Sequence, residues 1–202
     1  MKKILLDERH LLYVVSFLIV ILLTAQFVAA ETTPTEKLQR ADELSKKSFE
    51  TADEAKRTGD IDLARNALEL ADEATVLLSE VVEKASVVIT EVLDEKKKEK
   101  YCSSAQSSLS THYNVSKAIT QTIYSTTYIA QTSTSPKTVI DAKKIFKDAN
   151  ELMLKLENIK NKIIEILRAC GIEPVIPEPY KSPEEEKLKF KEIEEEEEAS
   201  PV

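Results

Sequence analysis

The sequence predicts an all-α protein, an elongated antiparallel bundle of about four helices arranged as two hairpins. Its 202 residues include only two glycines and no tryptophan, and they are rich in Lys, Glu, Ala, Leu and Ile, a composition that favours long helices. Apolar residues recur at intervals of three and four over long stretches, as expected for helices that face a bundle core. Glycine and proline fall between these stretches, where helices end and begin.

Residues 1–30 are predicted to be an N-terminal hydrophobic leader. An uncharged apolar run extends from Leu11 to Val28 after a short basic start, which is typical of a secretory signal peptide with cleavage after Ala30. The run is also nearly long enough to span a bilayer, so a retained membrane anchor is the second interpretation. Under both, the N-terminus lies inside and residues 31–202 lie outside the cytoplasm, secreted or anchored at the cell surface.

The first predicted hairpin has helices near 35–58 and 60–98. Pro34 occupies a first helical position, where its missing N–H costs nothing. Gly59 follows the first helix as a stop signal, and the side chain of Asp60 is suited to cap the next helix. The sequence therefore places a tight turn at these two residues.

The second predicted hairpin has helices near 103–133 and 137–170. Ser103, with a glutamine three residues later, matches a capping box and marks the expected start of the third helix. Ser135 and Pro136 give the same kind of start signal for the fourth helix. Within the third helix, residues 120–132 are β-branched, aromatic and uncharged, so a strand remains an alternative there.

The chain divides into the leader, a bundle domain at 31–171 and a tail at 172–202. The tail holds eleven Glu against four Lys and five prolines, so we expect it to be extended or disordered. It accounts for most of the net charge of −8. The bundle itself has no strong positive charge, which argues against a nucleic-acid partner.

The two cysteines are predicted to form a disulfide. Cys102 and Cys170 are equidistant from Pro136, so they face each other if the second hairpin is built of two equal helices. Each also continues the apolar stripe of its own helix, and an exported protein with two cysteines normally pairs them. Free buried thiols and an intermolecular bond are the alternatives. A metal site shared with His112 is excluded, because ten helical residues, about 15 Å, separate it from Cys102.

The sequence offers little catalytic chemistry. His112 is the only histidine outside the leader, so no two-histidine metal motif exists, and on a helix stripe it is more often a packing residue than a catalyst. Glycine-rich phosphate loops, nucleophile elbows and zinc-ligand spacings are not found. We therefore expect neither an enzyme nor a cofactor or metal site.

The third helix carries an unusual surface. From Ser103 to Ser135, sixteen of thirty-three residues are Ser or Thr, and Lys117 is the only charge. Its three tyrosines, Tyr113, Tyr124 and Tyr128, would add the rigid contact area familiar from binding surfaces. The second interpretation is that other helices flank this one and its hydroxyls bond back to the preceding turn.

A glycosylation sequon lies in the same helix. Asn114 is its acceptor, although a helical position is unfavourable for the modification.

From these features we expect an exported, non-enzymatic protein with a structural or interaction role, which binds a protein partner or itself through the Ser/Thr/Tyr-rich helix. A retained leader would add a membrane as partner. The alternative function is an extracytoplasmic binding module that holds a small apolar ligand or lipid in the bundle interior.

Overall fold

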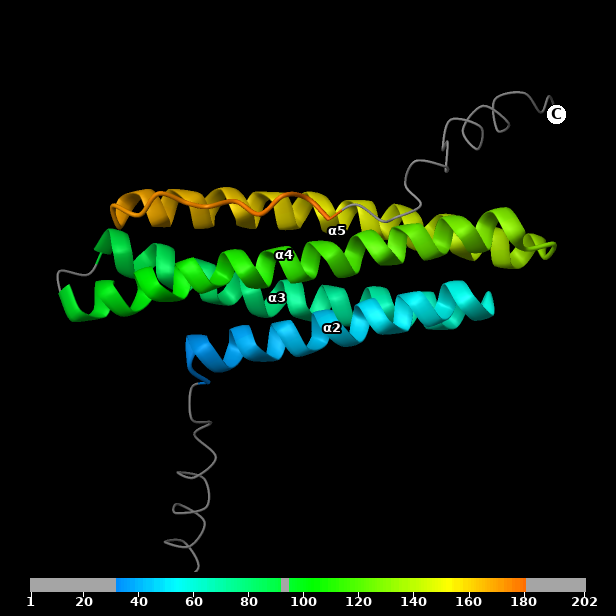
Figure 1. Ribbon diagram of the computed structural model, residues 1–202, viewed down its shortest axis with the longest axis horizontal. Helices are drawn as coiled ribbons and strands as arrows, with labels where there is room; N and C mark the ends of the chain where they lie inside the picture. Colours follow the sequence, from blue (N-terminus) through cyan, green and yellow to red (C-terminus); the bar gives the residue numbers. More distant parts are fainter. Residues whose placement is uncertain (1–31, 92–94, 181–202) are drawn as a thin grey trace, which may run out of the picture. The chain divides into compact units, whose positions relative to one another are not determined.

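The computed structural model describes residues 32–91 and 95–180, and within these ranges the chain forms four helices and no strand (Figure 1). They are α2 (Pro34–Thr58), α3 (Ile61–Glu91), α4 (Glu95–Thr132) and α5 (Pro136–Ala169). Consecutive helices run antiparallel, which confirms the predicted bundle of two hairpins. The predicted leader at 1–30 and the tail beyond Tyr180 lie outside the described residues.

The turn between α2 and α3 forms where the sequence placed it. Gly59 has a φ of +71°, a left-handed conformation in which a Cβ would be strained. The Oδ1 of Asp60 accepts hydrogen bonds from the backbone N–H groups of Asp62, at 2.8 Å, and Leu63, at 3.4 Å. These bonds satisfy donors that have no partner inside the first turn of a helix.

Both ends of α5 also follow their sequence signals. The Oγ of Ser135 accepts a hydrogen bond from the backbone N–H of Thr138 at 3.4 Å, and Pro136 is the first helical residue. At the other end Gly171 has a φ of +71°. Its N–H donates to the Arg168 carbonyl and that of Ile172 to the Leu167 carbonyl, both at 2.9 Å, which is a Schellman motif.

The junction between α3 and α4 differs from the prediction. The chain leaves α3 at Glu91 and enters α4 at Glu95, whereas the sequence suggested an end near 98 and a start at Ser103. Ser103 is therefore no cap: it lies inside α4, where its carbonyl accepts a hydrogen bond from the Ser107 hydroxyl at 3.2 Å. The charged stretch before Ser103 interrupts the apolar stripe but consists of good helix formers, so α4 already includes it.

The helices are not equivalent in their packing. Helices α3 and α4 each contact the other three, whereas α2 and α5 do not contact each other. The pair α3 and α4 therefore forms the centre of the bundle, with α2 and α5 on its two sides. Helix α4 is left with one outer face, which lies between α2 and α5.

The core differs between the α2–α3 contact and the space between α3, α4 and α5. Helices α2 and α3 approach closely because their facing residues are small, and the Ser48 hydroxyl of α2 reaches the Ala67 carbonyl of α3 at 2.7 Å. The alanines of this contact are fully buried: Ala41, Ala52, Ala55, Ala64, Ala67, Ala71 and Ala74. Larger side chains fill the space between α3, α4 and α5, among them Leu78, Val81, Ile119, Leu156, Ile163 and Leu167.

Candidate functional site

The hydroxyl groups of α4 lie largely inside the bundle. Ser108, Thr122 and Thr126 have no exposed surface, although their side chains are polar. Each donates a hydrogen bond to the carbonyl four residues earlier, at 2.8 Å from Ser108, 3.1 Å from Thr122 and 2.9 Å from Thr126. This back-bonding lets a hydroxyl be buried without an unsatisfied donor. For these residues the second interpretation of the Ser/Thr-rich helix is confirmed, and residues 120–132 are helical rather than extended.

Other polar groups of α4 hold it against α2. The Ser125 hydroxyl donates to the Ala52 carbonyl across the interface at 2.6 Å. Nearer the middle of the helix, the Nδ2 of Asn114 donates to the Oδ1 of Asp42 at 3.0 Å. That Nδ2 is the atom a glycan would need, and it lies half-buried inside a helix, so the geometry does not favour glycosylation there.

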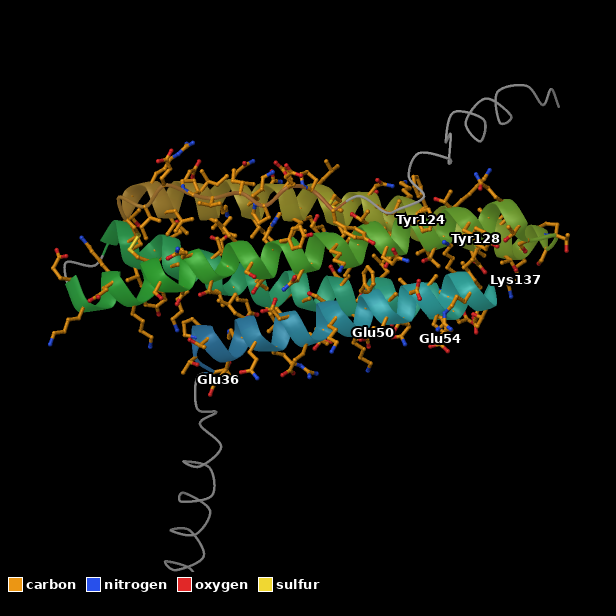
Figure 2. All side chains as sticks on the ribbon, in the orientation of Figure 1. Glu36, Glu50, Glu54, Tyr124, Tyr128 and Lys137 are labelled. Carbon is orange, nitrogen blue, oxygen red and sulfur yellow. A yellow bond between two sulfur atoms is a disulfide. The ribbon has the colours of Figure 1, made fainter. Side chains whose placement is uncertain are left out.

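The three tyrosines of the predicted contact surface differ in burial; Tyr124 and Tyr128 are labelled in Figure 2. Tyr124 is only 6% exposed, and its hydroxyl accepts a hydrogen bond from the Lys56 Nζ of α2 at 3.2 Å. The prediction that Tyr124 belongs to an open contact surface is therefore corrected, because this ring packs between helices. Tyr128 keeps 38% of its surface exposed and Tyr113 is half-buried.

A groove of about 1090 Å³ runs between α2 and α4. The α4 wall is mostly uncharged and offers hydroxyl groups, whereas the α2 wall carries carboxylates and a lysine around two apolar side chains, Leu38 and Phe49. The exposed α4 residues in this wall are Ser103, Ser107 and Ser110. Through this groove, solvent and a partner can reach one part of the predicted contact helix.

The chain's own residues 172–180, here called the strap, lie along the outer face of α4. The strap leaves the end of α5, turns back and runs along the bundle without helix or strand (Figure 1, orange trace). Pro174 and Pro177 line a small hollow of about 240 Å³ together with Leu109 and Tyr113 of α4. The first part of the predicted tail is thus extended, as expected, and rests on the helix that we had expected to meet a partner.

The strap ends in an aromatic contact that links three parts of the chain. The ring of Tyr180 meets the ring of Phe49 edge-on, with centroids 6.0 Å apart and an interplanar angle of 79°. The Nζ of Lys117 lies 4.5 Å from the Phe49 centroid and 5.2 Å from the Tyr180 centroid. Both arrangements are attractive, since a ring edge and an ammonium group are positive and a ring face is negative. We call these three residues the Tyr180 site.

Comparisons with protein-family models, with curated proteins and with solved structures find no match. Among the helices of 32–91 and 95–180, none is both long and apolar enough to cross a membrane. The same residues hold no cluster of three or more His, Cys, Asp or Glu side chains that could bind a metal ion.

The two cysteines meet as predicted. Cys102 of α4 and Cys170, the cap residue of α5, are bonded, with their Cα atoms 5.9 Å apart (Figure 2, yellow bond). Because Gly171 and the strap follow directly, the bond also fixes the start of the strap beside α4.

His112 faces α5 and is held in its neutral form. Burial lowers its pKa from 6.5 to about 4, with a further lowering by the charge of Lys160, while Glu157 and a backbone hydrogen bond at Leu156 act in the opposite direction. Its Nε2 is buried without a hydrogen-bond partner among the described residues. Because Leu156, Glu157 and Lys160 all belong to α5, His112 packs in the α4–α5 interface.

Acidification is expected to weaken the fold through His112. The unfolded chain binds a proton near pH 6.5 and the folded chain only near pH 4, so the free energy of unfolding falls as the pH drops between these values. The full difference is about 3 kcal/mol at 1.36 kcal/mol per pKa unit. Urea unfolding of the wild type and of His112→Gln at several pH values measures it. If the free energy of unfolding fell equally with pH in the two proteins from pH 7 to 4, His112 would not be the cause of the loss.

Proposed function

We propose that this chain is an exported, non-enzymatic helical protein that binds another protein through the groove between α2 and α4. The observation that carries the proposal is the surface of α4 at this groove. Its accessible residues are serines rather than the lysines and glutamates that cover the outer sides of the other helices. A solvent-facing groove wall whose exposed side chains are all hydroxyls is unusual, and such a wall is suited to hydrogen bonding with a partner.

Two further observations support the proposal. The groove has the size of a ligand-binding cleft, and its two walls differ in chemistry, which would orient a bound segment. The disulfide is compatible with an oxidising compartment, in agreement with the predicted leader. The alternative, an apolar ligand in the bundle interior, gains no support from the groove, because the groove opens on the surface.

Site-specific photo-crosslinking tests the proposal. A photoreactive residue at Ser110, in the groove, should yield an adduct with a second polypeptide in the protein's native membrane and medium fractions. The same residue at Asn66, exposed on α3 and outside the groove lining, is the matched control and should yield none. A second change, Ser107→Arg, in the protein that carries the photoreactive residue at position 110 should remove the adduct. The long cationic side chain would occupy the groove beside the α4 wall and exclude the partner. Equal adducts from both positions, or none from Ser110, would refute the proposal.

A further inference from the structure

We propose that the Tyr180 site recognises an extended, proline-spaced segment carrying an aromatic ring, and that the strap occupies this site reversibly until such a segment of a partner replaces it. The inference rests on the proposed function, because the Tyr180 site lies at one end of the same groove. Phe49 and Lys117 line the groove and hold the ring of Tyr180. The strap is thus a bound example of the ligand chemistry that the Tyr180 site accepts.

The strap has the right length to fill the site from within the chain. Its root is fixed at Cys102 by the disulfide, and its ring is fixed at Lys117, fifteen residues further along α4. That span is about 22 Å at 1.5 Å per helical residue. The nine steps from Gly171 to Tyr180 extend about 28 Å in a polyproline conformation, which leaves enough chain to cross from α5 to α2.

Between its two ends the strap is held weakly. Val175 is 85% exposed and Ile176 51%, so at least half of each aliphatic side chain in the middle of the strap stays in solvent. The small hollow beside Pro174 and Pro177 shows that the strap does not pack tightly against the surface of α4 beneath it. Ile172 packs on the core at the root and Tyr180 packs at the tip. A segment with two anchors and an exposed middle is suited to release at its tip while its root stays in place.

The chemistry of the site defines the partner. The partner segment must offer an aromatic ring that can lie beside the Lys117 ammonium with its edge or face against Phe49. A tyrosine or a phenylalanine provides such a ring. Prolines keep the segment extended before binding, so little conformational entropy is lost on binding. The α4 wall next to the site adds uncharged hydrogen-bonding groups and imposes no charge requirement.

Peptide binding in solution tests the inference with the full-length chain. The probe is a fluorescent peptide with the sequence of residues 172–181, and fluorescence anisotropy reports its affinity. Tyr180→Ala should empty the site and bind the probe. If the strap occupies the site nine-tenths of the time, the wild type should bind the probe about tenfold more weakly than Tyr180→Ala does.

A probe in which alanine replaces the tyrosine should not bind, and this control involves no change in the protein. Adding Phe49→Ala to Tyr180→Ala should abolish binding, with circular dichroism confirming that the helices remain.

Three results would overturn the inference. The first is equal affinity of the probe for the wild type and Tyr180→Ala, and the second is equal binding of the probe without its ring. The third is a wild-type dimer in native mass spectrometry that dissociates in Tyr180→Ala, because the strap would then occupy a second copy instead. The crosslink at Ser110 is measured in a chain with an intact Tyr180 site. Loss of peptide binding with a persisting crosslink would therefore reject this inference alone.

Discussion

Replacing both Cys102 and Cys170 with serine is expected to lower the free energy of unfolding by about 4 kcal/mol on the chain-entropy model. The disulfide joins residues 68 positions apart, so it closes a long loop in the unfolded chain and removes much of that chain's conformational freedom. The native helices do not depend on the bond for their caps, since the turn at Ser135 and the Schellman motif at Gly171 use backbone and hydroxyl groups. The variant should therefore fold, with lower stability.

Urea unfolding followed by circular dichroism measures this loss. The wild type under reducing conditions is the matched control and should unfold at the same urea concentration as the double serine variant. An unchanged midpoint would contradict the prediction. So would two alkylated thiols in the native wild-type protein, because the pair would then be free.

Leu156→Ala is expected to destabilise the bundle by about 2–5 kcal/mol, whereas Leu154→Ala should change its stability very little. Both residues are leucines in the middle of α5, two positions apart, so the change in helix propensity is the same. Leu156 is fully buried in the core, while Leu154 is 68% exposed. The truncation therefore leaves a cavity in one case and shortens a solvent-facing side chain in the other.

Thermal and urea unfolding of the two variants measure the difference directly. A similar loss in both would mean that the outer side of α5 is covered in solution. A small loss in both would mean that the core around Leu156 adjusts to fill the space. Either result would contradict the packing described here.

Helix boundaries were predictable where the chain contains residues with restricted or unusual backbone conformations. Gly59, Ser135, Pro136 and Gly171 mark ends that the structure confirms, because each acts through local geometry. The boundary between α3 and α4 has no such residue. The prediction of a helix start at Ser103 was wrong, because a serine with a glutamine three residues later also fits the middle of a helix.

The candidate site was predictable only in part. The disulfide followed from the symmetry of one hairpin, in which position along the chain fixes which residues face each other. The burial of Tyr124 depends on α2, whose position against α4 no local pattern reveals. The Tyr180 site joins residues from α2, α4 and the strap, and the only signal for it in the sequence was Lys117, the single charge between Ser103 and Ser135.

The disulfide also determines what a single proteolytic cut would do to this protein. The turn at 133–135 between α4 and α5 is a connection that a protease could reach, because Thr134 and Ser135 are exposed. It lies inside the ring closed by Cys102 and Cys170, so a cut there leaves one covalent molecule. A cut at Gly59 lies outside that ring and would leave α2 held only by its packing. Cleavage would thus act very differently at the two ordered turns of the bundle.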